Sequence, residues 1–363
     1  MAKTLSALTK SLFKVGLFGF GGGLGMLALL RMECVKKKQF ITDDELCTAV
    51  AMGQMLPGPF VPNYCEYIGY HLFGLRGAVA AGAALILPSF ILVIALSWFY
   101  LTYNTLPGIM LIFKGIGAVI TAIILWAAYE MSRVLIKDIK GIIIFFFALA
   151  LFLLRFDPIL TVILSGILSI LIVQTRIIKT ILFAVPLFLF DLSKGIELFG
   201  IFLKIGAIIF GGGYAAIPFI QNEVCNVRNW LTAKEFIDGV ALGQMTPGPV
   251  AITATFVGFK VMGIPGAVIA TLGIFLPSFL MLLILVRIYR RISSNRYVIS
   301  FFDGIKSAVV AILISTGFYF ASLNWLQPAY AIFGVVALII LIFLKFEPVL
   351  LLMIGAIFSL IAG

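Results

Sequence analysis

The stretch FKVGLFGFGGG at residues 13–23 is matched by LKIGAIIFGGG at residues 203–213, so one pattern occurs twice in the chain. Both copies run through a hydrophobic segment and end in three glycines. Glycine is a poor residue inside a helix and costs up to about 1 kcal/mol relative to alanine. Two equivalent interruptions therefore predict two structural repeats, each containing a helix that is broken at its glycine run.

Further matches, at the same offset in numbering or one position less, extend this repeat over the whole chain. They pair QFITDDEL with NWLTAKEF, GQMLPGP with GQMTPGP, LPSF with LPSF, FKGIGAVITAI with FDGIKSAVVAI, and RFDPIL with KFEPVL. The sequence therefore predicts a first repeat at 1–174, a linker at 175–194 and a second repeat at 195–363.

Composition identifies the class of protein. The chain has 363 residues, of which 63% are hydrophobic and 11% are charged, and its mean hydropathy is +1.19. A soluble domain is closer to half apolar and a quarter charged. The apolar runs are long and continuous, which favours membrane-spanning helices over a β-barrel. We therefore expect an all-α polytopic membrane protein.

The same composition argues against several functions. The net charge of +11 comes mostly from short gaps between apolar runs, which is typical of topology signals rather than of nucleic-acid binding. One histidine and four cysteines without a Cys-x-x-Cys pair do not predict a metal site. No nucleotide-binding P-loop and no nucleophile motif is present. We expect no enzyme activity, no catalytic residues and no cofactor.

Lysine and arginine counts predict that the two repeats are inverted. In the first repeat the gap 103–106 has none and the gap 133–140 has three, whereas in the second repeat the gap 287–296 has four and the gap 324–328 has none. Equivalent loops thus carry opposite charge bias. Inversion requires an odd number of crossings in the linker 175–194, which we expect to cross the membrane.

Each repeat has the same predicted elements. The first is a segment broken at FGGG, at about 5–30 and 197–220. The motifs Thr42-x-x-Glu45 and Thr232-x-x-Glu235 are capping boxes that begin a helix leading into Pro-Gly-Pro. Long helices at 77–102, 107–132, 264–286 and 303–323 follow, and then a pair of shorter helices. The charge pattern also predicts that both broken segments are re-entrant.

The breaks are the expected binding site. A broken helix presents unpaired backbone N–H groups and the positive end of a dipole, which an anion can satisfy. Inverted repeats with broken helices are typical of secondary transporters, whose sites lie near the bilayer midplane. Close packing of helices is the alternative role for the glycines. The predicted binding residues at the breaks are Phe20, Gly21, Gly22, Gly23, Pro57, Gly58, Pro59, Phe210, Gly211, Gly212, Gly213, Pro247, Gly248 and Pro249.

Polar residues inside the apolar segments complete the predicted site. Lys14 and Lys204 are equivalent and would add positive potential, unless they extend toward the membrane surface. The amides Gln54 and Gln244, together with Thr253, suit an oxyanion, although an amide can equally link helices. The equivalent Glu33 and Glu223 are candidates for coupling, with pairing or capping as the alternative.

The segments FGGGYAAIPFIQNEV, NWLTAKEFIDGVALGQMTPGPVAITATFVG and GIPGAVIATLGIFLPSF closely resemble the chromate ion transporter family. The first repeat carries the same landmarks. This resemblance implies the long-chain, two-domain form of the family with antiparallel halves, in the cytoplasmic membrane of a prokaryote. It implies chromate export, and hence chromate resistance, driven by an ion gradient. The coupling ion would be a proton or a counter-anion. The protein would be surrounded by membrane lipid, and a homodimer is one expected assembly.

The first repeat departs from the family pattern after its Pro-Gly-Pro motif. Relatives often have Thr-Ser-Thr there, and this chain has Phe60, Val61 and Pro62. Chromate and sulfate are both tetrahedral dianions, so a sulfate-type oxyanion remains an alternative substrate. An anion channel of the same architecture is the alternative mechanism.

Overall fold

A computed structural model describes residues 4–20, 22–173, 194–292, 295–344 and 346–362. All secondary structure in these ranges is helical. The first repeat contains α1 (Leu5–Phe18), α2 (Gly22–Leu30), η1 (Arg31–Lys37), α3 (Asp43–Met55), α4 (Phe60–Tyr103), α5 (Pro107–Leu135), α6 (Ile139–Leu153) and α7 (Pro158–Val173). The linker predicted to cross the membrane lies outside the described residues, apart from its last residue, Lys194.

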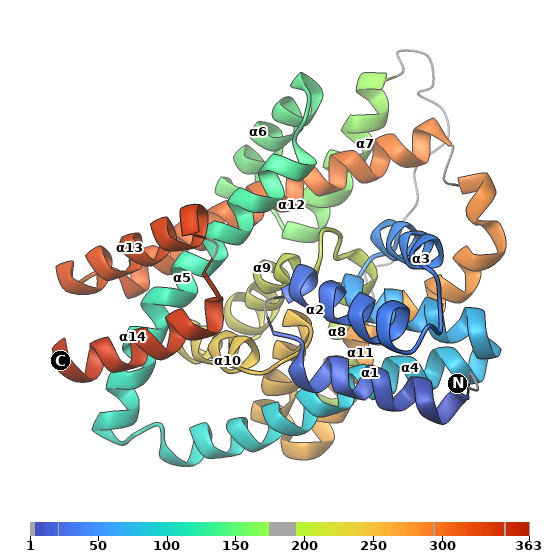
Figure 1. Cartoon of the computed structure of the whole chain (residues 1–363). Coiled ribbons are helices and arrows are strands. Elements are labelled where there is room, and N and C mark those ends of the chain that lie inside the picture. Colours follow the sequence, from blue (N-terminus) through green and yellow to red (C-terminus); the bar gives the residue numbers. More distant parts are fainter. Residues whose placement is uncertain (1–3, 21, 174–193, 293–294, 345, 363) are drawn as a thin grey trace.

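The second repeat follows the same order as the first. It contains α8 (Lys194–Ile208), η2 (Gly213–Ala215), α9 (Ala216–Gln221), η3 (Asn222–Val227), α10 (Ala233–Met245), η4 (Val250–Ile252), α11 (Thr253–Ile292), α12 (Arg296–Asn324), α13 (Pro328–Leu344) and α14 (Pro348–Ala362). The repeated, broken helices predicted from the sequence are therefore present. Figure 1 shows how the two sets interlock.

Both predicted capping boxes are formed. The Thr42 hydroxyl accepts a hydrogen bond from the Glu45 N–H at 3.2 Å, and the Glu45 carboxylate accepts one from the Thr42 N–H at 2.7 Å. The corresponding distances at Thr232 and Glu235 are 3.2 and 2.9 Å. These reciprocal bonds satisfy two of the N–H groups that a helix start leaves unpaired. They fix the starts of α3 and α10, which lead into the Pro-Gly-Pro turns.

Among the described residues, four helices are long and apolar enough to span a membrane, namely α4, α5, α11 and α12. The predicted helices at 77–102 and 264–286 match the second parts of α4 and α11, whose first parts start at Phe60 and Thr253, after the Pro-Gly-Pro turns. Each continues through a kink, where Gly74 and Gly263 have φ of +63° and +64°. Glycine reaches positive φ without steric cost, so the two helical parts join through a bend instead of a loop.

Two predicted boundaries were wrong, namely the end of α11 and the start of α12. The gap expected at 287–296 is nearly closed, because α11 continues to Ile292 and α12 begins at Arg296 rather than at 303. Apolar periodicity marks only the part of a helix within the apolar phase, so polar ends extend beyond it. Pro59 and Pro249 lie one position before the first helical residue, with extended ψ of 125° and 137°.

The two repeats are interlocked. Helices α13 and α14 pack on α5 of the first repeat, and α6 and α7 pack on α12 of the second (Figure 1). Small residues allow these approaches: a Cβ at Gly115 would collide with the Gly355 carbonyl, and one at Gly304 would meet Ser165 and Ser169. The final hairpin of each repeat therefore completes the packing of the other.

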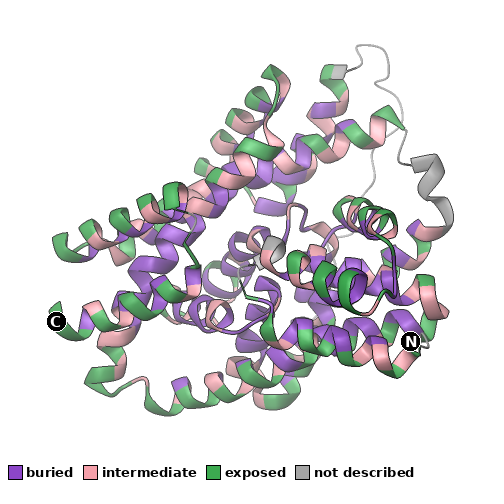
Figure 2. Cartoon of the chain, in the orientation of Figure 1, coloured by how far each residue is buried: buried purple, intermediate pink, exposed green. Residues whose placement is uncertain are grey.

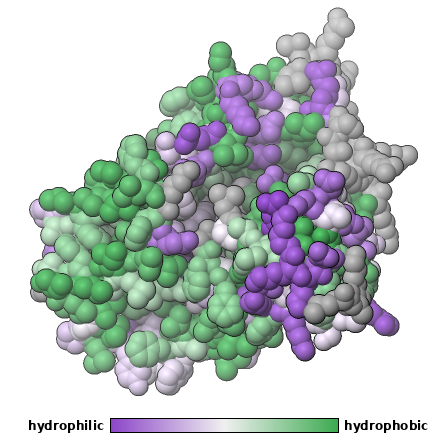
Figure 3. All heavy atoms as spheres, viewed as in Figure 1, coloured by the Kyte–Doolittle hydropathy of each residue, from purple (hydrophilic) through white to green (hydrophobic). Residues whose placement is uncertain are grey.

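The outer surface is that of an integral membrane protein. Buried residues concentrate at the centre of the molecule, and the outward faces of the peripheral helices are exposed (Figure 2). Large hydrophobic side chains, including Phe343, Leu344 and Ile361, are among the most exposed. Figure 3 shows a broad hydrophobic face over α13 and α14, with hydrophilic side chains gathered around α3. Such a face suits contact with lipid rather than water.

Candidate functional site

The helix breaks of the two repeats meet at the centre of the protein. The Gly58 N–H donates a hydrogen bond to the Ile209 carbonyl at 2.6 Å, and the Gly248 N–H donates one to the Gly19 carbonyl at 3.0 Å. Gly58 and Gly248 are equivalent, as are Gly19 and Ile209. Each Pro-Gly-Pro turn therefore bonds the chain just before the FGGG motif of the opposite repeat, with the reciprocity of a pseudo-two-fold axis.

Both central glycines of these turns require their residue type. Gly58 has φ of +92° and Gly248 has φ of +114°, a region that residues with a Cβ seldom occupy. A Cβ at Gly58 would lie 2.8 Å from the Ser278 Cβ, and one at Gly248 would collide with the Ser89 hydroxyl. The Ser89 hydroxyl itself donates a hydrogen bond to the Pro247 carbonyl.

The junctions thus bring together three motifs of the sequence, because Ser89 and Ser278 belong to the two LPSF stretches. The predicted meeting of the FGGG and Pro-Gly-Pro breaks is present in the structure. The backbone N–H groups at the breaks were expected to bind an anion. Those of Gly58 and Gly248 instead donate to carbonyl oxygens of the opposite repeat. In this conformation these two amides hold the repeats together and are not free donors.

A small polar cavity lies at one junction, where the first FGGG motif meets the second Pro-Gly-Pro turn. Its lining includes Phe20, Tyr214, Gln244, Thr246 and Gly248, and its volume is about 10 Å³. The Tyr214 hydroxyl donates to the Gln244 Oε1 at 3.1 Å. The Gln244 Nε2 is buried without a hydrogen-bond partner in the described part of the chain. An unpaired buried donor is unfavourable, so a ligand with acceptor oxygens would be stabilised here.

The other junction differs in size and polarity. A cavity of about 450 Å³ lies where the first Pro-Gly-Pro turn meets the second FGGG motif, and it is lined by apolar residues including Pro57, Phe210, Met281 and Phe301. The polar cavity can hold about one water molecule at most, which is too small for a tetrahedral oxyanion. The cavities beside the two junctions therefore differ in size and polarity, although the hydrogen bond of each junction is formed.

The other predicted site residues are distributed around these junctions. Gln54 is exposed, unlike its equivalent Gln244. Phe210 is buried against Phe302, with ring centroids 4.8 Å apart, whereas Phe20 is 38% exposed. The Thr253 hydroxyl donates to the Val250 carbonyl at 2.9 Å, within its own turn.

The glycines of the FGGG motifs are placed unequally. Gly211 and Gly212 have φ of +104° and +96°, and Gly213 packs against Val250 after the second Pro-Gly-Pro turn. In the first motif Gly22 and Gly23 already belong to α2, and Gly21 lies outside the described residues. In both motifs the second half-helix therefore starts within the glycine run itself.

Lys14 and Lys204 lie in equivalent ion pairs. The Lys14 Nζ is 2.7 Å from the Glu33 Oε1, and the Lys204 Nζ is 3.1 Å from the Glu223 Oε1. The hydrogen bond from Lys14 holds the pKa of Glu33 below its ordinary value, so the carboxylate is charged. Pairing was the open alternative to a coupling role, and these contacts favour it.

Each carboxylate also has a second basic partner. Lys37 lies 3.1 Å from the Glu33 Oε1, and Arg228 pairs with Glu223 through its Nη1. Glu33 and Glu223 are 3% and 5% exposed, whereas the lysines are half exposed. Each carboxylate, in a π-helical turn after the broken segment, thus ties α1 or α8 to that turn. One net positive charge remains at the Glu33 cluster, whereas Glu197, 2.7 Å from the Arg228 Nε, makes the Glu223 cluster neutral.

Removal of the Glu223 carboxylate tests this structural role. We expect Glu223→Gln to destabilise the protein by roughly 1–2 kcal/mol, between the values for exposed and buried ion pairs, because it leaves Lys204 and Arg228 without their shared partner. The midpoint of thermal unfolding in detergent measures the effect. Asp43→Asn is the control, since Asp43 pairs with Arg31 on the exposed surface. An equal shift in both variants would contradict the prediction.

Sequence reasoning missed three features of this region. These are the serines of the LPSF motifs, the buried pair of Tyr100 and Asp238 with a hydrogen bond of 2.6 Å, and the buried Glu66. Repetition of LPSF could have indicated the serines. A lone acidic residue in the apolar run after Pro-Gly-Pro could have indicated Glu66.

Comparison with known proteins gives a consistent result. The sequence profile of the family described as "Chromate transporter" matches residues 6–170 and again residues 196–360. The matched ranges are the two repeats, so each repeat is by itself one unit of that family. No solved structure matches the chain.

Curated relatives cover nearly the whole chain. An uncharacterized transporter of Methanocaldococcus jannaschii is 30% identical, over 95% of this chain and 91% of its own length. A protein named "Probable chromate transport protein" in Synechococcus elongatus is 31% identical over 85% of this chain and 82% of its own length. A "Chromate transport protein" of Cupriavidus metallidurans is 29% identical over 95% of this chain and 89% of its own length.

Proposed function

This chain belongs to the chromate transporter family, and from that membership we propose that it exports chromate or a related tetrahedral oxyanion across the cytoplasmic membrane. The family is one of membrane transporters, and the apolar surface agrees with that class. Family membership identifies a membrane transporter, and the proposal specifies its substrate, the direction of transport and the mechanism. In this mechanism the two inverted repeats move relative to each other around a central site, as in other secondary transporters.

The reciprocal meeting of the helix breaks is the observation that carries the proposal. Gly58 and Gly248 bond the opposite repeats at two equivalent junctions. Beside one of them, the Gln244 Nε2 is a buried donor without a partner among the described residues. An oxyanion offers acceptor oxygens to such a donor and to backbone N–H groups at the starts of half-helices.

The unequal junctions support alternating access. One cavity has about 10 Å³, and the other, which is lined mainly by α7, α11 and α12 beside the first Pro-Gly-Pro turn, has about 450 Å³. In an inverted pair of repeats, exchange of these two states opens the site on one face and closes it on the other. We propose that the polar junction binds the oxyanion when its Pro-Gly-Pro turn moves away from Gly19.

Two alternatives differ from this proposal, one in the substrate and one in the mechanism. The first repeat lacks hydroxyl residues directly after Pro-Gly-Pro, which favours a sulfate-type oxyanion with chromate as an analogue. An anion channel would conduct without coupling. The narrow polar cavity favours the transporter, because a conducting pore requires a continuous path.

Reconstitution of the full chain into proteoliposomes tests the function. We expect saturable accumulation of chromate, inhibited by sulfate and molybdate, because all three are tetrahedral dianions that offer acceptor oxygens to the same donors. Phosphate should compete less well, because near neutral pH it carries at least one proton. Its P–OH group is a hydrogen-bond donor and would face the N–H donors of the site. Liposomes without protein are the control.

The outcomes separate the alternatives. Stronger inhibition by sulfate than by unlabelled chromate would favour the sulfate-type substrate. Unitary currents in planar bilayers that do not saturate with anion concentration would favour a channel. Absence of any oxyanion flux in a folded preparation would contradict the proposed function.

A further inference from the structure

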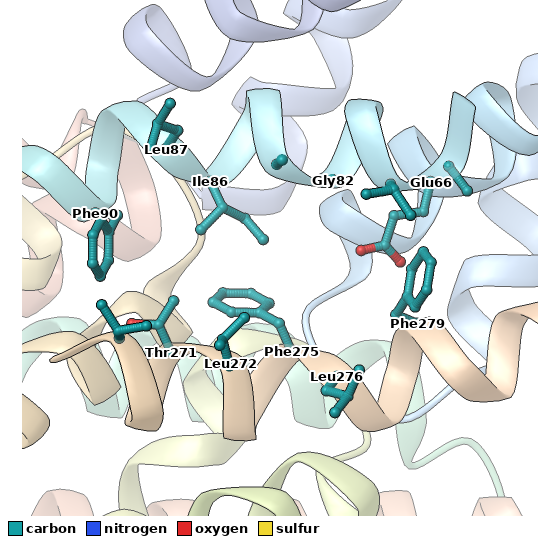
Figure 4. Close-up of a pocket in the computed structure, with 14 residues that line it drawn as sticks. Glu66, Gly82, Ile86, Leu87, Phe90, Thr271, Leu272, Phe275, Leu276 and Phe279 are labelled. Carbon is teal, nitrogen blue, oxygen red and sulfur yellow. The ribbon is translucent and has the colours of Figure 1, made fainter. Parts of the chain in front are cut away.

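Glu66 is a buried carboxylic acid at the contact between the repeats. It lies in the part of α4 before the kink, two turns after the first Pro-Gly-Pro motif, and is 3% exposed. Its side chain enters a cavity of about 360 Å³ between α4 and α11. Figure 4 shows the carboxyl group directed away from α4, toward Phe279 of α11.

The surroundings of this carboxyl group are apolar. Ile86, Phe90 and Phe275 are among the lining residues, and Thr271 is the single other polar one. No lysine, arginine or histidine lines the cavity, in the part of the chain that the structure describes. On α4 itself the adjacent titratable group is the buried thiol of Cys65. Glu66 therefore faces no positive charge from the described parts of α4 or of α11.

One oxygen of the carboxyl group has no hydrogen-bond partner in the described part of the chain. Its Oε2 is buried and unpaired among the described residues. Its Oε1 lies over Gly82, where a Cβ would come within 2.8 Å. An ionised carboxylate is very unfavourable in such a place, whereas the protonated acid is neutral and much less costly. The geometry therefore selects the protonated form in this conformation.

The second repeat has no such acid at the equivalent place. The helices around the kinks align at an offset one position less than the Pro-Gly-Pro motifs do, so Glu66 corresponds to Thr255 and Gly82 to Thr271. The Thr255 and Thr271 hydroxyls are joined by a hydrogen bond of 2.7 Å. A satisfied Thr–Thr pair thus stands where the first repeat has an unpaired acid over a glycine. The asymmetry leaves one protonatable carboxyl group at this contact, among the residues that the structure describes.

The cavity is open toward the hydrophobic surface. Val79, Leu87 and Leu272 line it and are 53%, 46% and 56% exposed. Because α4 and α11 each begin at a Pro-Gly-Pro turn, separation of the turns from the opposite repeat would change the α4–α11 contact. Water reaching the cavity would then accept the proton from Glu66.

We propose that Glu66 binds the proton that this transporter couples to its oxyanion, holding it in the conformation described and releasing it to water when the repeats move. The proposal rests on the proposed transport function and supplies its coupling ion. Glu33 and Glu223 are less suited, because each is already paired with two basic residues.

Chemical labelling tests the proton site without any transport. The lipophilic reagent N,N′-dicyclohexylcarbodiimide adds to protonated carboxyl groups and, after acyl migration, leaves an N-acylurea that contains all atoms of both reactants. We expect Glu66 to be labelled at pH 7 at least about tenfold more than the exposed Asp43, since a carboxyl group of ordinary pKa, about 4, is ionised there. Mass spectrometry of the peptides reads the adduct. Equal labelling of the two residues would overturn the proposal.

Transport coupled to proton movement tests the role. Wild-type proteoliposomes with an internal pH dye should show proton flux with chromate flux. Glu66→Gln mimics the protonated acid permanently, so chromate exchange at equal pH should stay within about twofold while proton flux falls at least about tenfold. Thr255→Val is the matched control from the second repeat and should keep proton flux.

The results distinguish the two proposals. Proton flux retained in Glu66→Gln, or chromate flux without proton flux in the wild type, would overturn the role of Glu66 and leave the transport function standing. Absence of chromate flux in the wild type would overturn the function, and carbodiimide labelling would still decide whether Glu66 holds a proton.

Discussion

Replacement of Gly248 by alanine is expected to reduce oxyanion transport at least about tenfold, since the residue is held at φ of +114° and such backbone strain costs about 1–3 kcal/mol for other residues. The new Cβ would also collide with the Ser89 hydroxyl. Either the turn shifts or Ser89 moves, and both changes weaken the bond from the Gly248 N–H to Gly19. Initial rates of chromate uptake in proteoliposomes measure the loss.

Three glycines control for other effects of this substitution. Gly58→Ala should behave like Gly248→Ala, because it occupies the equivalent turn. Gly263→Ala introduces a similar φ strain, at +64°, with no atom within 4 Å, and Gly200→Ala places a Cβ in open space on an ordinary helix. If Gly248→Ala transported as well as Gly200→Ala, the junction would not be part of the transport machinery.

Replacement of Gln244 by leucine is expected to reduce the affinity for oxyanion about 10- to 150-fold, the equivalent of one hydrogen bond to a charged group at about 1.5–3 kcal/mol. Leucine has a similar size and lacks the Nε2 donor that the small cavity leaves unpaired. Leucine also lacks the Oε1 that accepts the Tyr214 hydroxyl, so we expect a modest loss of thermal stability beside the loss of affinity. Concentration dependence of chromate uptake measures the apparent affinity.

The repeat supplies the matched control. Gln54→Leu changes the equivalent residue of the first repeat, which is exposed and lies outside the polar cavity. We expect a change of less than about threefold, within the range of surface substitutions. A loss at Gln54 equal to that at Gln244 would move the site to the other junction. Unchanged affinity in both variants would exclude a role of these amides in binding.

Local signals made the architecture predictable. Glycine and proline at the breaks, and threonine with glutamate at the helix starts, act through backbone conformation and capping within a few residues. The recurrence of these signals in the same order identified the two repeats. The end of α11 at Ile292 and the start of α12 at Arg296 were less predictable, because apolar periodicity does not mark the polar ends of helices.

Packing across the repeats was not predictable from these patterns. The hydrogen bonds of Gly58 and Gly248 join residues far apart in the chain, and no local pattern specifies their partners. The π-helical turns η1 and η3, which position Glu33 and Glu223, likewise have no sequence signal that we recognised. The predicted re-entry of the broken segments and the crossing of the linker remain predictions.

Glu66 illustrates a different difficulty. At the offset that fits the Pro-Gly-Pro motifs, its counterpart is Phe256, and the comparison is uninformative. The chain has one extra residue in the first repeat between the turn and the kink, so the true counterpart is Thr255. The LPSF motifs show that the offset changes after the turn, and the packing of Gly82 and Thr271 around these positions agrees with the shifted correspondence.

The interlocking of the final hairpins bears on biogenesis. The surface of α5 that receives α13 and α14 is synthesised long before they are, and α12 must be present before α6 and α7 can pack. Neither repeat can therefore mature independently as the ribosome delivers it. The first repeat must remain in the bilayer as a partly assembled bundle until translation is nearly finished. A chain interrupted late in synthesis would leave the surface of α5 uncovered and would be a substrate for membrane-protein degradation.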